Sequence, residues 1–577
     1  MKNISNNVVG QSLMLEFETV FSEESPLSVE EYLQGGDKNI VLKLAAAFLS
    51  IRPHDSKFND NKFLIFTIFF SSGNSDFAQH VYTAILRAEK KWGEVEVINN
   101  YSSLKLFETF IINEGMEVTQ TPEEFERNLF KAYLVLNSKF TKAQMAAYTN
   151  PSLKEEKREL QYPVMVFTSQ YPISDKTEYN IFEVWLAQTI KAIYLFRFLE
   201  ANAKTLPILN ALLAYFNCSN WVEFLKRMMP LSMSAIEVEK EGHTDIVVTK
   251  NEQFVENCNF IEKLVIQQSD ELEEYDFLTL RLKPFYKIDE GAYRVIFNLF
   301  VVEKLFKGIY FLLRQVNKQL PKGQKMDDGG LRSTYCYEFS EKTLTYEILN
   351  LIYPGKNIKF SGHELDNMGI VGAPDYYIRK GKNILLFESK DFLIRADKKA
   401  SFDYDIFEPE LMKTLYCKVN DRGKQENGAV MQLIHSIRRI LKKDFSADKN
   451  YNYREVFIYP IIIIHDHQYD TAGLNKIVND WFQEELKMLE SEEGFFIYRV
   501  KPLVIVNIDS LIIHQVGLAE DIPLHKVLDL FGEETKEKPY QRFKTQEDYR
   551  VSTMSKLIPF SMFISKYFSH KSIRPIS

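Results

Sequence analysis

The segment Gly372–Lys390 has the sequence GAPDYYIRKGKNILLFESK. Two apolar runs flank a polar turn, Arg379–Asn383, with Gly381 at its centre, and this pattern predicts an antiparallel β-hairpin. If the pairing is centred on Gly381, Asp375 falls nearly opposite Phe387 and Glu388. The hairpin is therefore expected to bring two carboxylates to the same end of a β-sheet.

The second strand of this hairpin ends in charged residues. Because side chains alternate between the faces of a strand, Glu388 and Lys390 share one face and converge with Asp375. Hard cations such as Mg²⁺ prefer oxygen ligands, and a lysine beside such a cation can offset charge that develops on a phosphate. We therefore predict that Asp375 and Glu388 bind Mg²⁺ or Mn²⁺ and that Lys390 assists the attacking water.

A chance match to Glu-x-Lys is the alternative, because the pattern recurs in polar contexts. It occurs again at Glu89–Lys91, Glu155–Lys157 and Glu534–Lys536. Among these, Glu388–Lys390 alone ends an apolar strand and follows a Pro-Asp pair across a short turn. In the alternative interpretation, the hairpin lies on the surface and its charges form an incidental salt bridge.

Pro374-Asp375 and Glu388-Ser389-Lys390 resemble the signature of the PD-(D/E)XK nuclease superfamily. The resemblance extends over about residues 336–508. It implies a restriction-endonuclease-like α/β domain with a mixed central sheet. It also implies a metal-dependent endonuclease that hydrolyses phosphodiester bonds, with DNA as the expected substrate.

Two flanking helical patterns agree with this resemblance. The family usually places a helix with an acidic residue before the sheet, and Glu341 is predicted as that catalytic residue, with Glu338 and Glu347 as alternatives. The family also places a helix after the Glu-x-Lys strand, often with a glutamine. The pattern Gly428–Ile440 resembles this second helix, and Gln432 is predicted there as an accessory ligand or phosphate contact.

Basic residues of the hairpin turn and of the later helix are candidates for contacts with a nucleic-acid backbone. They are Arg379, Lys380, Lys382, Arg438 and Arg439. For Arg438 and Arg439 the alternative is a solvated helix flank without a ligand. The turn residues are expected to lie around the proposed site.

The overall charge argues against nucleic acid at first sight, because the 577 residues carry a net charge of −8. Residues 331–577 hold 35 basic and 35 acidic side chains, so the excess negative charge belongs to residues 1–330. Since the local field governs how a phosphate approaches, the neutral second part is compatible with a nucleic-acid substrate. A hydrophobic fraction of 45% excludes wholesale disorder, and the four widely spaced cysteines do not form a disulfide scaffold.

A cluster of Pro, Gly and Asp residues within Gln319–Arg332 divides the chain. Helical periodicity dominates before it, and strand-like runs alternate with helical patterns after it. We therefore predict an α+β multidomain protein. Residues 1–325 form a mainly α-helical region with a regulatory or partner-binding role. Residues 326–577 form the nuclease-like domain, with a basic helical extension at its end.

This layout resembles subunits of bacterial restriction and anti-phage defence systems, some of which act with a separate motor protein. A partner ATPase or GTPase, or a sensor subunit, is therefore expected beside the DNA substrate. The other function considered is a non-catalytic helical adaptor that uses a nuclease-like fold to bind nucleic acid or a partner. No apolar run approaches the length of a membrane span, so a soluble, cytoplasmic protein is expected.

A second candidate site is His465-Asp466-His467, which follows the apolar run Tyr459–Ile464. Histidines at alternate positions of an extended segment can share a metal ion. No further Cys or His lies near them in the sequence to complete such a site. A loop at the end of the strand is therefore the favoured interpretation.

Overall fold

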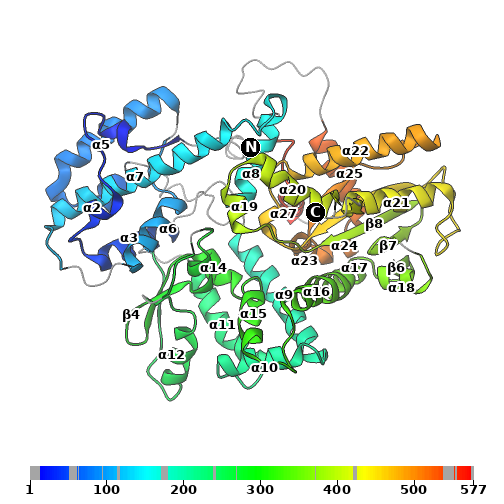
Figure 1. Cartoon of the computed structure of the whole chain (residues 1–577), viewed down its shortest axis with the longest axis horizontal. Coiled ribbons are helices and arrows are strands. Elements are labelled where there is room, and N and C mark those ends of the chain that lie inside the picture. Colours follow the sequence, from blue (N-terminus) through cyan, green and yellow to red (C-terminus); the bar gives the residue numbers. More distant parts are fainter. Residues whose placement is uncertain are drawn as a thin grey trace.

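The computed structural model describes residues 13–50, 62, 64–93, 95–112, 117–170, 180–237, 242–267, 270–273, 275–370, 372–419, 425–536, 552 and 555–572. Helices surround a central β-sheet, and a largely helical first part lies beside it (Figure 1). The α+β class expected from the sequence is confirmed. None of the described helices combines the length and the hydropathy needed to cross a membrane.

The central sheet of the described residues has five strands in the order β12-β11-β8-β7-β6. These strands are β6 (Ile358–Ser361), β7 (Tyr376–Lys380), β8 (Asn383–Lys390), β11 (Phe457–Ile464) and β12 (Val504–Asn507). β6, β7 and β8 pair antiparallel, whereas β8, β11 and β12 pair parallel, so the sheet is mixed as predicted. β8 and β11 lie inside the sheet, which explains their nearly continuous apolar sequences.

β7 and β8 form the hairpin that the sequence predicts. Gly381 turns the chain with a φ of 63°. The pairing continues from this turn to Tyr376 opposite Phe387. Continued by one residue, this register sets Asp375 opposite Glu388, one of the two residues expected there. Every side chain in the interior of β8 is buried, so packing on both faces holds this strand in place.

Helices cover both faces of the sheet (Figure 1). One face is covered by α8 (Arg158–Gln170), α20 (Tyr404–Leu415), α21 (Ala429–Lys442) and α22 (Leu474–Glu493). The other is covered by α9 (Ile181–Ala201), the π-helix η5 (Thr334–Thr345), α17 (Tyr346–Ile352), α23 (Ile508–Ile513) and α27 (Phe560–Ser572). α21 packs against β8 on the first face, and η5 packs against β8 on the second.

The helix that precedes the sheet begins inside the segment expected to break the chain. α16 (Asp328–Ser333), η5 and α17 follow one another without interruption. Asp327 caps this helix, because its side chain accepts a hydrogen bond from the Gly330 amide at 2.8 Å. The hydrogen bond of this cap offsets the loss of helix stability caused by Gly329 and Gly330 in the first turn.

The remaining elements complete the two parts of the chain. The other helices before residue 330 are α1 (Phe17–Val20), α2 (Val29–Leu33), α3 (Lys38–Ser50), η1 (Leu64–Phe69), η2 (Ser72–Asn74), α5 (Ser75–Trp92), α6 (Asn100–Ile112), α7 (Pro122–Tyr148), η3 (Glu155–Lys157), α10 (Leu206–Tyr215), α11 (Trp221–Ile236), α12 (Phe254–Glu262), α13 (Leu278–Leu282), α14 (Asn298–Glu303) and α15 (Ile309–Gln319). The other strands are β1 (Leu13–Met14), β2 (Val95–Glu96), β3 (Asp245–Val247), β4 (Phe285–Asp289), β5 (Ala292–Val295), β9 (Cys417–Val419) and β10 (Gln425–Asn427). The later helices are α18 (Gly362–Asn367), α19 (Ala396–Ala400), η6 (His467–Tyr469), α24 (Gln515–Glu520) and α25 (Leu524–Thr535).

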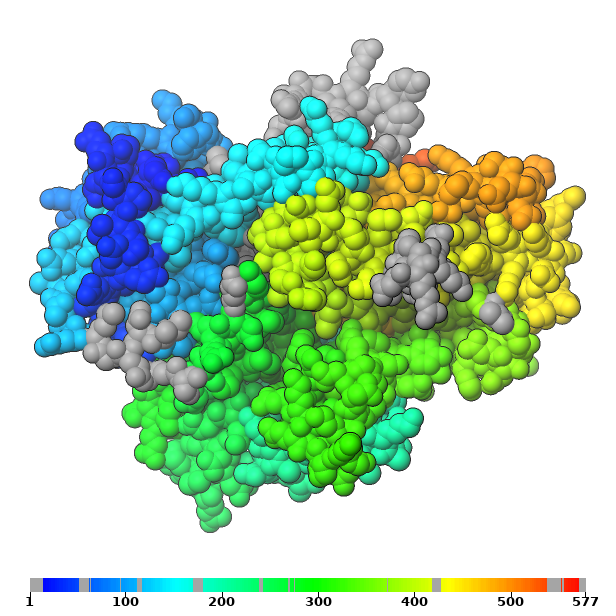
Figure 2. Space-filling view, viewed as in Figure 1, coloured from blue at the N-terminus to red at the C-terminus, as the bar shows by residue number. Residues whose placement is uncertain are grey.

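Buried side chains cross the predicted boundary at residue 325. One core combines Phe196 of α9 with Ile461 of β11, and another combines Val164 of α8 with Leu386 of β8. Figure 2 shows the cyan segment of α8 against the yellow-green segment of α19 and α20. α8 and α9 therefore pack into the unit built on the sheet. The division into a regulatory and a nuclease-like part stays a prediction.

Candidate active site

Main-chain hydrogen bonds fix the position of Asp375, just before β7. The Ser389 amide donates to Asp375 Oδ2 at 2.7 Å, and the Gly362 amide donates to the Asp375 carbonyl oxygen at 2.7 Å. A Cβ atom at Gly362 would lie 3.1 Å from that carbonyl oxygen, so this approach favours glycine. The Asp375 carboxylate is thereby held beside the end of β8.

Lys390 joins the two carboxylates of the hairpin. Its Nζ lies 2.8 Å from Glu388 Oε2 and 3.4 Å from Asp375 Oδ2. Glu388 is fully buried, and Glu388 Oε1 has no hydrogen-bond partner. Asp375, Glu388 and Lys390 thus lie together, in the arrangement expected from the hairpin register, while their catalytic roles stay a prediction.

Two carboxyl groups at this site, those of Glu388 and Glu341, resist ionisation. Burial, and after it the charge of Asp375, raise the pKa of Glu388 well above its usual range. The same two causes raise the pKa of Glu341 in η5 to about 8. Burial acts to lower the pKa of Lys390, but Asp375 and Glu388 outweigh it and raise that pKa, so the amine stays protonated. Lys390 thus pairs with Asp375 and Glu388 and interacts electrostatically with Glu341, and a divalent cation would relieve the repulsion among these three acidic residues.

Glu341 is the acidic candidate on its helix that shares the electric field of Asp375 and Lys390. Of the two alternatives, Glu347 is exposed, and Glu338 lies 3.6 Å from Lys342. η5 is π-helical, with i→i+5 hydrogen bonding in place of i→i+4, and such stretches are frequent at functional sites. The structure therefore favours Glu341 over its two rivals.

A buried polar cluster lies behind β8, and nothing in the sequence analysis anticipated it. His465 Nε2 lies 2.8 Å from Ser389 Oγ and 3.4 Å from Thr345 Oγ1. Burial lowers the pKa of His465 to about 4, so its ring is neutral. The Ser389 amide binds Asp375, and the Ser389 side chain points to the other face of β8, where it contacts His465. The cluster therefore helps to hold the Ser389 amide in position. The one sequence feature that could have indicated this cluster is Ser389, a polar residue at a buried position of a largely apolar strand.

Gln432 lies half-buried on α21, which packs against β8. A helix that connects two parallel strands runs opposite to them, so the first turns of α21 lie near the end of β8. Ser436, one turn further, is fully buried, and its hydroxyl has no hydrogen-bond partner. No hydrogen bond between the described side chains joins Gln432 to Asp375, Glu388 or Lys390. Its role as an accessory residue stays a prediction.

The basic residues of the hairpin turn do not surround the carboxylates, and that part of the expectation is wrong. Because β7 runs away from Asp375, Arg379, Lys380 and Lys382 lie at the opposite end of the hairpin. Arg379 pairs with the buried Asp448, and Lys382 lies 2.6 Å from Glu455.

The two arginines of α21 also lie apart from the carboxylates. Arg438 lies 3.3 Å from Glu492, at the far end of α22. Arg439 lies half-buried in the last turn of α21. Contacts of these two residues with nucleic acid stay a prediction.

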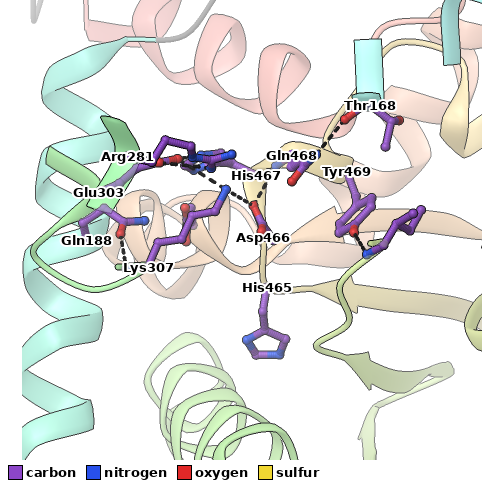
Figure 3. Close-up of polar contacts among 12 residues, drawn as sticks. Thr168, Gln188, Arg281, Glu303, Lys307, His465, Asp466, His467, Gln468 and Tyr469 are labelled. Atoms are coloured by element: carbon purple, nitrogen blue, oxygen red, sulfur yellow. Dashed lines mark hydrogen bonds and ion pairs between the residues drawn. The ribbon is translucent and has the colours of Figure 1, made fainter. Parts of the chain in front are cut away.

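The motif His465-Asp466-His467 forms a loop at the end of β11, as favoured from the sequence, and its two histidines have different partners. His467 Nε2 lies 2.8 Å from Glu303 Oε1, and Lys307 Nζ lies 2.9 Å from Asp466 Oδ1 (Figure 3). Figure 3 also shows that His465 lies apart from this group. The loop is thus tied to α14 and to the segment that follows it.

No protein-family model, curated protein or solved structure matches the chain. The functional assignment therefore depends on the site itself. Within the described ranges, no three His, Cys, Asp or Glu side chains form a ready-made metal site, and the ammonium of Lys390 lies between Asp375 and Glu388. The donor set nevertheless fits Mg²⁺, because it offers carboxylate oxygens of which one, Glu388 Oε1, is buried and unpaired.

Mg²⁺ is expected to raise the unfolding temperature more at about pH 8.5 than at about pH 6. The cation binds ionised carboxylates, and the raised pKa values of Glu341 and Glu388 keep these groups protonated at the lower pH. Without metal, a carboxyl group whose pKa is raised in the folded protein contributes stability below its unfolded pKa. It loses this contribution as pH rises through its folded pKa. Thermal unfolding with and without MgCl₂ at both pH values measures the effect.

The control uses another glutamate on the same continuous helix. In Glu341→Gln the Mg²⁺-induced rise in unfolding temperature should differ less between the two pH values. In Glu347→Gln, at an exposed position, that difference should not change. Equal Mg²⁺ shifts at both pH values in the unsubstituted protein would show that these carboxyl groups do not bind the cation.

Proposed function

We propose that the protein is a metal-dependent endonuclease of the PD-(D/E)XK type that hydrolyses phosphodiester bonds in DNA. The observation that carries the proposal is the buried Glu388, paired with Lys390 beside Asp375 and left with one unpaired oxygen. Burial of a glutamate side chain next to a second acidic residue destabilises a fold, so a ligand at this position is a better explanation than structural support.

Asp375, Glu388 and Glu341 would hold Mg²⁺, which polarises a phosphate and lowers the pKa of a bound water. The chain prepares this site with its own groups. The Ser389 amide orients the Asp375 carboxylate. Asp375 and Glu388 raise the pKa of Lys390, so its ammonium donates hydrogen bonds and offsets negative charge on the phosphate beside the attacking water. Gln432 would contact the phosphate from the rim.

The first part of the chain is proposed to regulate this site. Glu303 and Lys307 bind His467 and Asp466 of the loop that follows β11, and Arg281 pairs with Glu303 behind them (Figure 3). This loop begins next to the end of β8, because Ile464 pairs with Lys390. Lys399, shortly after Lys390, pairs with Asp276 of the first part. A partner ATPase or GTPase, or a sensor subunit, of a restriction or anti-phage system would act through these contacts.

The test is cleavage of supercoiled plasmid and linear DNA by the purified protein with Mg²⁺ or Mn²⁺. Conversion to nicked or linear products is expected, and Asp375→Ala should abolish it. Asp366→Ala, at an exposed position on the neighbouring α18, should leave the rate unchanged. Cleavage that persists in Asp375→Ala overturns the site. DNA binding without cleavage under each metal favours the non-catalytic adaptor.

A further inference from the structure

The end of the sheet opposite Lys390 carries aromatic rings and cations, some of them exposed. We call it the amino-edge surface and define it by Lys443, Tyr453, Arg454, Phe457, Phe496, Tyr498 and Arg499. The yellow segment after α21, which supplies part of it, projects from the end of the molecule on the right of Figure 2. This surface is separate from the carboxylate site, because β8 spans about 23 Å between its two ends.

The segments of this surface are in direct contact. Lys443 Nζ lies 5.6 Å and the Arg454 guanidinium 5.5 Å from the centre of the Tyr453 ring. The Arg499 guanidinium lies 4.8 Å from the Phe457 ring and 5.2 Å from the Tyr498 ring. Arg499 also donates to the Glu455 carbonyl oxygen at 3.2 Å, which links the two segments. The result is one continuous patch of rings and cations.

The exposure of the aromatic rings is unusual for residues of this kind. Tyr498 is 71% exposed, and Phe496, two residues before it, is 74% exposed. Neither ring contributes much to a core, so the Phe496 ring and the face of Tyr498 that Arg499 does not cover stay in contact with water. Exposed aromatic faces beside cations are the features that stack unpaired bases and bind a phosphate backbone.

The charge of the surface is positive. Lys443, Arg454 and Arg499 form no ion pair with a carboxylate in the part of the chain that the structure describes. Two nearby carboxylates are already paired, Asp448 with Arg379 and Glu455 with Lys382, and Asp444 is exposed next to Lys443. The three cations therefore remain available to phosphates.

We infer that the amino-edge surface binds an unpaired segment of nucleic acid, by base stacking on Tyr498 and Phe496 and by phosphate contacts of Arg454 and Arg499. This rests on the proposed function in assuming a nucleic-acid substrate, and it adds that the substrate contains or acquires single-stranded DNA. An acidic peptide would use the cations and leave the rings unused. A duplex would likewise engage the cations alone, because its bases are stacked on one another.

The test is fluorescence anisotropy of a labelled oligothymidine of about 20 nucleotides with the full chain in EDTA, so that no cleavage is needed. Tyr498→Ala should weaken binding about 5- to 100-fold, and Tyr498→Phe should bind as the unsubstituted protein does. Arg499→Ala should weaken binding and reduce its dependence on salt. The matched control is Trp92→Ala, where a 49% exposed ring has Lys91 Nζ at 4.5 Å from its centre.

Each outcome is decisive. Tyr498→Ala and Phe496→Ala variants that bind oligothymidine as tightly as Trp92→Ala does overturn the inference. The inference is also overturned if polyglutamate displaces the oligonucleotide and both ligands lose affinity equally in Arg499→Ala and lose none in Tyr498→Ala. That result would assign the surface to an acidic peptide. The proposed function is judged separately: plasmid cleavage that depends on Asp375 can stand while this surface fails, and the surface can stand without any cleavage.

Discussion

Replacing Lys390 with methionine is expected to lower DNA cleavage by about 10³-fold. The Lys390 ammonium lies between Glu388 and Asp375, and its raised pKa keeps it charged through the working pH range. Removal of this charge takes away the group that would stabilise the phosphate. Initial rates of plasmid nicking measure the effect. Lys356→Met, which removes an exposed lysine just before β6, is the control and should cleave normally.

The same substitution should destabilise the protein, and a double variant separates the two effects. Where Glu388 is ionised, the loss of Lys390 leaves a buried carboxylate without a counter-ion, at a cost of up to about 3–5 kcal/mol. The folded pKa of Glu388 is then still higher than in the unsubstituted protein. The Lys390→Met variant should therefore keep its stability below the unfolded pKa of Glu388 and lose it as pH rises toward the folded pKa. The double variant Glu388→Gln/Lys390→Met should recover stability and lose this pH dependence, yet remain inactive. Cleavage by either variant at the unsubstituted rate would refute the role of Lys390.

The sequence predicted the parts of the site that depend on short-range rules. Turn chemistry at Gly381 and the alternation of side chains fixed the register that sets Asp375 beside Glu388. The mixed sheet followed from strand-like runs that alternate with helical patterns. These features are decided by residues close to one another in the chain, so a single sequence carries the information.

The remaining features depend on contacts that no local pattern records. Glu341 could not be distinguished from Glu338 or Glu347, because η5 is π-helical and does not follow the period of an α-helix. The basic turn was expected near the carboxylates, although the strand that leads to it carries the chain away from them. His467 and Glu303, separated by 164 positions, meet only after the whole chain has folded.

Replacing Glu303 with alanine is expected to lower the free energy of unfolding by about 3–5 kcal/mol at neutral pH. Glu303 is 4% exposed and lies 2.8 Å from His467 Nε2, 3.3 Å from an Arg281 guanidinium nitrogen and 3.3 Å from Lys307 Nζ. Its loss leaves an uncompensated positive charge in a buried network that joins the first part of the chain to the end of β11. Urea denaturation of both proteins measures the difference.

The pH dependence of this difference provides the sharper test. Burial acts to raise the pKa of Glu303, but Lys307, Arg281 and His467 together lower it well below its usual range. A depressed carboxyl pKa contributes stability above the unfolded pKa of about 4.3 and loses it as pH falls through the folded value. The two proteins should therefore converge in acid. Glu18→Ala, which removes an exposed partner of Lys142, should change stability by less than about 0.5 kcal/mol. An equally small effect at Glu303 would mean that the network does not hold the two parts of the chain together.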